Sequence, residues 1–340
     1  MNISFFENST VPSQTNRVLG HEGTSLAWFV FSILCSIIGT ALLLLLLLAS
    51  FRVKRLRSGS SILVVHLMLI ELIICGVTFP IFLITTHTGL TGVHVQVNCQ
   101  VFMYFFLTTI HTEYWASLVL AVNRFFALVL PHHHRKLLSK TGLIIMILIP
   151  WIVGLGVTLP LYFGIGGRFI LRTSPFESCA FMSQTSGYGI GLAFLGAYLP
   201  IGLIGLIYAV LGVRWLVGSF SKRFVAVQVV AAVGPAAAPS QGNVAAKTRR
   251  VLLLRMLVVT YLWHCLCFLP PPILISSFPG LVVSHPKLVS LWLFKTMLLC
   301  GYVVSPFIFL VLNVDYQKGV QNLFNIGRGA IHESRGRPSI

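Results

Sequence analysis

The sequence predicts an all-α fold, a seven-transmembrane helix bundle followed by a short amphipathic surface helix. Of its 340 residues, 56% are hydrophobic and only 9% are charged, whereas soluble domains carry about 25% charged residues. Apolar segments long enough to cross a bilayer as helices recur along the chain. These segments cover residues 26–51, 61–86, 97–130, 141–164, 187–216, 250–278 and 288–313.

The placement of the basic residues predicts how the chain crosses the membrane. The net charge is +17, and 17 of the 24 lysines and arginines lie in alternate connections, at 51–60, 131–141, 213–250 and 314–340. Basic loops stay on the cytoplasmic side of a membrane. We therefore expect an extracellular N-terminus and a cytoplasmic C-terminus. The positive charge follows from this topology and does not indicate nucleic-acid binding.

The amino-terminal segment 1–25 is predicted to be extracellular. Asn2 and Asn8 each begin an N-glycosylation sequon, and this modification takes place on the lumenal side. No basic stretch with a small-residue cleavage site precedes the first apolar segment. We expect no removable signal peptide, so that the first span serves as a signal anchor.

The cysteines predict one disulfide bond. Five of the seven lie in the interior of predicted spans, where a thiol behaves as a small hydrophobic group. Only Cys99 and Cys179 fall in extracytoplasmic positions, where an oxidising compartment favours a disulfide between them. Cys265 and Cys267 do not have the spacing of a metal site, and we expect none there.

Two cytoplasmic regions follow from composition. The connection 218–247 is rich in Ala, Pro and Gly, and it is predicted to be a flexible loop. An amphipathic helix is predicted over 314–326, with 327–340 as a polar cytoplasmic tail. The apolar face of this helix comprises Tyr316, Val320, Leu323 and Phe324.

The third span carries charges at positions that must avoid lipid. Glu113 precedes Arg124 by eleven residues, and eleven steps of about 100° return to the same helix face. Glu71 in the second span is the other acid within the predicted spans. Charged side chains there must face protein or water.

Five of the predicted spans carry motif residues at characteristic distances from one another. They are Cys99, Arg124 and Pro131; Trp151; Pro200 and Tyr208; Cys267-Phe268-Leu269-Pro270; and Ser305-Pro306-x-x-Phe309 followed by Asn313 and Tyr316. On these motifs the chain resembles the rhodopsin-like G-protein-coupled receptors over its whole seven-span length. The resemblance implies a multi-pass plasma-membrane receptor whose partners are an extracellular ligand, the lipid bilayer and a heterotrimeric G protein.

The resemblance gives Arg124 the role of G-protein contact, swinging toward Tyr208 when the sixth span moves outward about Pro270. Where the family usually has Asp-Arg-Tyr, this chain has Asn123-Arg124-Phe125. Because the neighbouring carboxylate is missing, we hypothesise measurable basal activity.

The expected switch residues are Phe268, Pro270, Ser305, Pro306 and Phe309. Ser305-Pro306-x-x-Phe309 replaces the family's Asn-Pro-x-x-Tyr, which leaves the details of switching open. Phe268 stands where the family often has tryptophan, as it does in the purinergic and lipid-receptor branch.

The resemblance places Glu71 and Glu113 in the polar pocket where family members often hold a sodium ion. Two nearby carboxylates in a low dielectric cannot both stay ionised without a cation. Two alternatives stay open: a sodium ion shared by the pair, or protonated glutamates without an ion. No other cofactor is expected.

The expected ligand pocket contains Lys295, eleven residues before Pro306 and therefore on the same helix face, toward the outside. Together with Arg168 and Arg172 in the outer loop, the Lys295 ammonium would suit an anionic head group such as that of a lipid. The alternative for Lys295 is a lysine that snorkels to the membrane interface.

Three further positions bear on the chemical class of the ligand. Phe106 stands where amine receptors carry an aspartate, which disfavours an aminergic ligand. Leu299 stands where opsins carry their Schiff-base lysine, which disfavours retinal. His111 is either a pH-sensitive partner in the pocket or a histidine held by a hydrogen bond.

These features predict a ligand-activated receptor and no enzyme, since no acid–base pair, nucleophile elbow or phosphate loop appears. One alternative is a decoy or scaffolding receptor that binds ligand without coupling, which the altered motifs favour. The other is a transporter or channel, for which two glutamates and one lysine supply few polar groups.

Overall fold

A computed structural model describes residues 19–53, 59, 61–93, 97–130, 134, 137–172, 176–183, 186–229, 241–270, 273–274 and 278–335. The predicted glycosylation sites Asn2 and Asn8 and the motif residue Pro131 lie outside these ranges.

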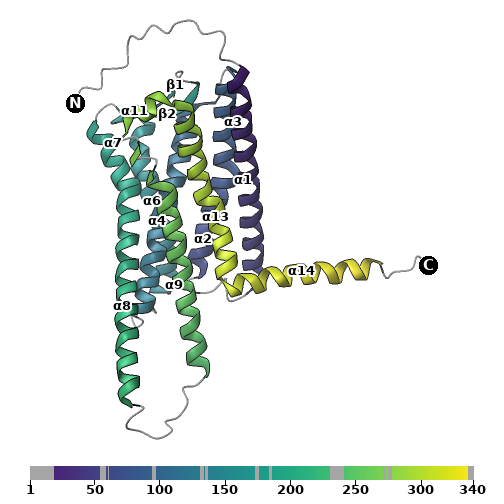
Figure 1. Cartoon of the computed structure of the whole chain (residues 1–340), viewed down its shortest axis with the longest axis vertical. Coiled ribbons are helices and arrows are strands. Elements are labelled where there is room, and N and C mark those ends of the chain that lie inside the picture. The colour runs from purple at the N-terminus through teal and green to yellow at the C-terminus, as the bar shows by residue number, and fades with distance from the viewer. Residues whose placement is uncertain are drawn as a thin grey trace.

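The chain forms an elongated helical bundle (Figure 1). Six of its described helices are long and apolar enough to cross a membrane, and Arg255–Phe268 is a shorter apolar helix. The elements of the bundle are α1 (Leu19–Arg52), α2 (Ser61–Ile73) with α3 (Phe79–Leu90), α4 (Cys99–Val129), α6 (Lys140–Tyr162), α7 (Ser186–Ala193) with α8 (Leu199–Val229), α9 (Gln241–Phe268), the short α11 (Pro279–Ser284) and α12 (Pro286–Leu288), and α13 (Met297–Leu312).

Two proline positions coincide with π-helical turns. One turn, η2 (Ile74–Thr78), ends just before Pro80, and another, η3 (Phe194–Tyr198), ends just before Pro200. Proline has no N–H to donate and crowds the preceding turn, so a wider turn there relieves the clash. A third π-helical segment, η4 (Val289–Thr296), leads into α13 without a proline.

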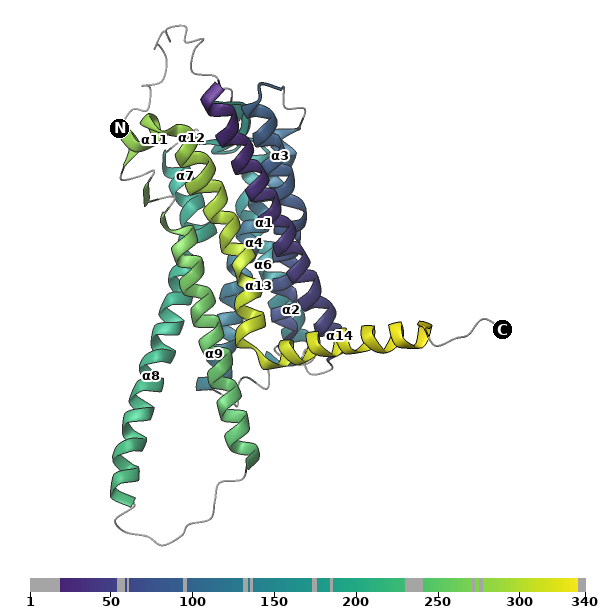
Figure 2. The ribbon, with the colours of Figure 1, turned by 45° about the vertical axis from the view of Figure 1, so that its right-hand side comes forward.

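The helices on either side of the connection 218–247 are longer than predicted. α8 continues to Val229 and α9 begins at Gln241, so only residues 230–240 of the predicted loop lie outside the described helices. Both helices extend beyond the body of the bundle (Figure 2). Extending an existing helix needs no new nucleus, and the alanines on both sides favour it.

Two other helix ends differ from prediction. α9 stops at Phe268 instead of residue 278, because the prolines that follow cannot continue its hydrogen-bond ladder. The surface helix α14 (Val314–Arg335) continues beyond the predicted end at residue 326. α14 leaves the base of the bundle sideways (Figures 1 and 2).

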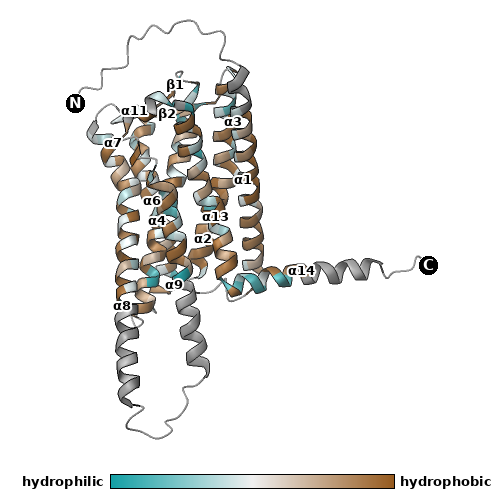
Figure 3. Cartoon of the chain, viewed as in Figure 1, coloured by the Kyte–Doolittle hydropathy of each residue, from teal (hydrophilic) through white to brown (hydrophobic). Residues whose placement is uncertain are grey.

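Hydrophobic residues cover the bundle's length (Figure 3). Large apolar side chains remain exposed on α1 and α6, such as Ile37 at 58% and Ile152 at 65%. Exposing this much apolar surface to water is energetically unfavourable, whereas contact with lipid is not. Buried polar groups instead face other helices: the hydroxyls of Thr108 and Thr158 bond across α4 and α6 at 2.7 Å.

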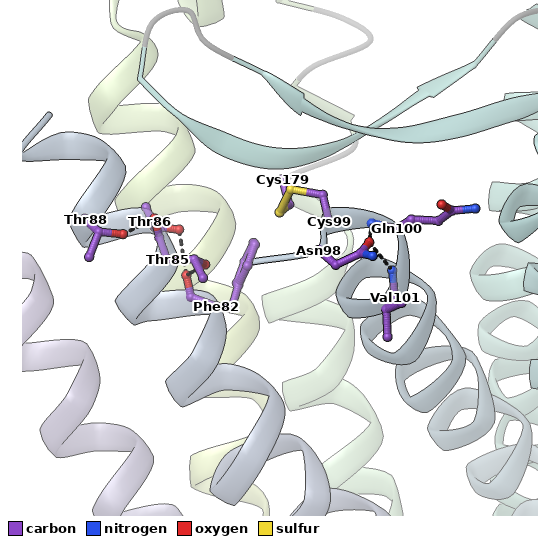
Figure 4. The surroundings of a disulfide bond; sticks show 9 residues. All are labelled: Phe82, Thr85, Thr86, Thr88, Asn98, Cys99, Gln100, Val101 and Cys179. Atoms are coloured by element: carbon purple, nitrogen blue, oxygen red, sulfur yellow. Dashed lines mark hydrogen bonds between the residues drawn. A yellow bond between two sulfur atoms is a disulfide. The ribbon is translucent and has the colours of Figure 1, made fainter. Parts of the chain in front are cut away.

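A β-hairpin covers the outer end of the bundle. Strand β1 (Gly167–Arg172) pairs antiparallel with β2 (Ser178–Ser183), with Leu171 opposite Cys179. Cys179 forms the predicted disulfide with Cys99, the first residue of α4 (Figure 4). The Asn98 side chain caps the same helix by accepting from the backbone N–H of Gln100 and of Val101. The disulfide therefore attaches the hairpin to a well-fixed helix end.

Candidate functional site

Arg124 lies near the inner end of α4, opposite the disulfide. Its charge interacts with the hydroxyls of Tyr208 on α8 and Tyr316 on α14. The Tyr208 ring meets the Tyr261 ring edge-on, with centroids 5.6 Å apart. Burial raises the pKa of the Tyr316 hydroxyl, and the nearby Arg124 charge partly offsets this effect. Arg124 therefore lies within electrostatic range of one hydroxyl on α8 and one on α14.

Asn123 turns away from Arg124. It is fully buried, and its side-chain amide donates to the Met146 sulfur on α6 at 3.8 Å. A sulfur acceptor forms only a weak hydrogen bond, so Asn123 serves mainly to fill the contact between α4 and α6. Asn123 therefore supplies no charge to hold Arg124.

The expected switch residues lie at the contact between α9 and α13. The buried Phe268 ring packs on Tyr302, with centroids 5.1 Å apart, and on Tyr114, at 5.5 Å. A Cβ at Gly301 would lie 2.6 Å from the Phe268 ring, so only glycine allows this close contact. Pro270 lies two residues past the end of α9. Phe268 is thus held tightly between α4 and α13.

The other expected switch residues, Ser305, Pro306 and Phe309, are buried on α13. Phe309 borders a small cavity of about 40 Å³ between α4, α8, α9 and α13. Tyr208 and Tyr261 also line this cavity. Tyr208 and Phe309 therefore border the same small void in the inner half of the bundle.

The two acids of the spans lie near one another in the centre of the bundle. Glu71 and Glu113 are fully buried, and their charges interact. Ser305 donates to one Glu71 oxygen at 3.0 Å, and Ser117 donates to one Glu113 oxygen at 2.9 Å. Within the described part of the chain, the second oxygen of each carboxyl group is buried without a hydrogen-bond partner.

Two serines lie beside these acids and donate hydrogen bonds to them. Ser117 and Ser305 already direct their hydrogens at carboxyl oxygens. No third His, Cys, Asp or Glu joins the two acids in a metal-binding group among the described residues. A proton on a carboxyl group removes the cost of a buried charge without requiring further ligands.

Lys295 lies in η4 near the outer end of the bundle and points inward. Its side chain is 7% exposed, and its ammonium donates to the Thr86 hydroxyl on α3 at 2.6 Å. The ammonium nitrogen also lies 4.6 Å from the centre of the Phe82 ring and 5.3 Å from that of Phe176. Phe176 belongs to the connection between the hairpin strands. This inward geometry disfavours the snorkelling alternative.

The described residues provide no carboxylate close enough to form an ion pair with Lys295. Its charge is stabilised by one hydroxyl and two aromatic faces. Such contacts compensate only part of the cost of burying an ammonium. An anion would be a strong partner for it.

Of the other predicted pocket residues, Phe106 is linked to Lys295 through the Phe82 ring. Phe106 packs in an aromatic cluster, 4.8 Å from Phe82 by ring centroids. The His111 ring lies against Gly196, where a Cβ would come within 2.4 Å of it. Arg168 and Arg172 are exposed on β1. Phe82 therefore contacts both Lys295 and Phe106, whereas the two arginines lie at the surface.

Three residues of the site escaped the sequence analysis. They are Thr86, Tyr302 and Trp28, and each lies in an apolar run where nothing distinguishes it from core residues. The fully buried Trp28 indole of α1 donates to the Leu291 carbonyl at 3.1 Å and to the Thr296 hydroxyl at 2.9 Å. It thereby fixes η4, the segment that carries Lys295.

Comparison with known proteins gives a match to the family model described as 7 transmembrane receptor (rhodopsin family), over residues 43–309. Melanopsin-A of Danio rerio is 22% identical over 209 residues, which cover 61% of this chain and 34% of that protein. The G-protein coupled receptor 52 of Bos taurus is 30% identical over 114 residues, covering 34% of this chain and 31% of that receptor.

A longer match is to the 5-hydroxytryptamine receptor 7 of Xenopus laevis. It is 22% identical over 307 residues, which cover 80% of this chain and 70% of that receptor. The chain spans only about a third of the length of melanopsin-A and of the receptor 52. At such identities the relatives do not specify a ligand for this chain.

Proposed function

Because the chain belongs to the rhodopsin family of seven-transmembrane receptors, we propose that it converts binding of an extracellular ligand into activation of a heterotrimeric G protein. It is a multi-pass plasma-membrane signalling receptor and not an enzyme. The distribution of basic residues supports an extracellular N-terminus and a cytoplasmic C-terminus. The observation that carries the coupling proposal is the electrostatic interaction of Arg124, at the inner end of α4, with the hydroxyls of Tyr208 and Tyr316.

The proposed mechanism is a population shift between two packings of the bundle. In the described packing, Phe268 is wedged between Tyr114 and Tyr302. Ligand binding near Lys295 favours a second packing in which α9 moves outward and the cavity beside Phe309 rearranges. Arg124 then binds backbone carbonyls of an inserted G-protein helix. The neutral Asn123 stands where the family usually has a carboxylate, and this replacement supports basal activity.

The experiment that tests this function measures guanine-nucleotide exchange by a panel of purified G proteins, with and without the full-length chain. Exchange above the level of empty membranes establishes coupling. If no G protein shows increased nucleotide exchange, even when a ligand is bound to the receptor, the decoy alternative is supported. Ligand-dependent ion flux in the same membranes would instead support a transporter or channel.

We propose that the ligand carries an anionic group bound by Lys295. Free fatty acids and their uncharged methyl esters provide a matched pair of probes. On the wild type, an active acid is expected to be at least about tenfold more potent than its ester, since a charge-assisted hydrogen bond is lost. On the Lys295→Met variant, the acid is expected to lose its advantage, so that acid and ester have equally low potency. The exposed Lys287→Met provides the control.

A preference for the acid that persists in Lys295→Met would rule out this anchoring role. The surface arginines Arg168 and Arg172 then become the next charges to test for the ligand. Phe268 is similar to the residue found in the purinergic and lipid-receptor branch of the family. The set of probes therefore also includes a nucleotide.

We propose that Glu71 and Glu113 hold a proton and not a sodium ion. The thermal unfolding temperature of the purified receptor is therefore expected to be the same in sodium chloride as in potassium chloride at equal ionic strength. Glu71→Gln is expected to unfold close to the wild-type temperature, because a neutral amide oxygen can still accept from Ser305. Stabilisation by sodium that disappears in Glu71→Gln would establish a sodium site.

A further inference from the structure

A groove opens on the outer side of the bundle, where α4 begins and α6 ends. Its volume is about 450 Å³. α6 has 23 residues and spans about 34 Å, so its last residue, Tyr162, lies at the outer membrane boundary. The groove therefore lies at the level of lipid head groups. Its walls are formed by Gln100, Leu161, Tyr162, Phe163, Gly164, Arg168 and Phe169.

The backbone fixes the shape of this groove. Gly164 has a φ of +75°, a conformation that ends helices and that other residues adopt only with strain. Its N–H donates to the Leu161 carbonyl at 3.1 Å. The Gln100 side chain donates to the Tyr162 carbonyl and ties the first turn of α4 to the last turn of α6. The groove is thus a preformed feature.

The groove combines one cation with a continuous apolar surface. Leu161 and Phe169 form a buried floor, while Arg168 is exposed above it. A guanidinium presents paired donors that match two phosphate oxygens. The adjoining helix surfaces that face lipid expose large apolar side chains: Val101 at 50%, Phe105 at 43%, Leu159 at 43% and Phe163 at 68%.

We propose that this groove binds a phospholipid of the outer leaflet, with its phosphate on Arg168 and its acyl chains along the exposed faces of α4 and α6. The Tyr104 and Tyr162 rings, with centroids 5.2 Å apart, flank the head-group level, as aromatic side chains do at membrane interfaces. A soluble anion would use Arg168 alone. A lipid also covers the apolar side chains that continue from the groove along both helices.

The test uses the purified full-length receptor in detergent and native mass spectrometry. The probes are dioleoylphosphatidylglycerol, dioleoylphosphatidylcholine and dioleoylglycerol, which has the same acyl chains without a phosphate. We expect both phospholipids to bind more tightly than the diacylglycerol. In Arg168→Gln, the affinity for the phospholipids is expected to fall about tenfold, to that of the diacylglycerol.

Arg172→Gln is the matched control, because Arg172 is exposed on the same strand and does not line the groove. It is expected to leave phospholipid affinity unchanged within about twofold. An equal loss in both variants would overturn the assignment, since it would reflect general surface charge. Displacement of the lipids by inorganic phosphate at equal concentration would also overturn it, in favour of a soluble-anion site.

Discussion

Replacing Arg124 by alanine is expected to reduce guanine-nucleotide exchange by the wild-type G-protein partner at least about a hundredfold, down to the level of empty membranes. Arg124 lies at the inner end of α4, and its charge interacts with the hydroxyls of Tyr208 on α8 and Tyr316 on α14. An alanine offers no donors to the carbonyls of an inserted helix. The measurement is exchange on the receptor reconstituted in vesicles, with surface amount matched between variants.

Arg255→Ala is the matched control for this loss. Arg255 is exposed on α9 toward the same end of the bundle, so its removal changes the local charge equally and spares the contacts of Arg124. We expect Arg255→Ala to retain exchange within about threefold. If Arg124→Ala retained exchange while Arg255→Ala lost it, Arg255 and not Arg124 would be the coupling residue.

Replacing Cys99 by serine is expected to produce the largest loss of folded receptor. The disulfide to Cys179 closes a loop with a sequence separation of 80 residues. Losing such a bond costs about 2–5 kcal/mol, and it releases the hairpin from α4. Phe176, between the two strands, would no longer be fixed over Lys295. The measurements are cell-surface amount by antibody binding and the thermal unfolding temperature.

Cys300→Ser controls for the loss of a thiol, because Cys300 is a free cysteine on α13. It is expected to reach the surface like the wild type. Cys179→Ser and the double variant should match Cys99→Ser, since both single changes remove the same bond. Normal surface amounts and unfolding temperatures for Cys99→Ser would show that packing alone holds the hairpin.

The sequence determined the architecture of this protein. Apolar length, the alternation of basic loops and the outer cysteines predicted the spans and the disulfide between Cys99 and Cys179. The spans and their orientation depend on the free energy of each residue in lipid or water, which is nearly independent of its neighbours. The disulfide depends on the oxidising compartment outside the cell. The spacing of the motifs, among them Arg124, Pro270 and Pro306, indicated the family. Within one span, helical rise converts sequence distance directly into depth in the membrane.

Only the tertiary structure decided which side chains meet. It placed Lys295 on Thr86 and beneath Phe176, turned Asn123 toward Met146 and left Arg168 over a separate groove. It also extended α8 and α9 into the predicted loop. Such contacts join residues as many as 268 positions apart, as Trp28 and Thr296 are. They depend on how each helix rotates and tilts against its neighbours, and that is set by packing of all helices together and by no local pattern.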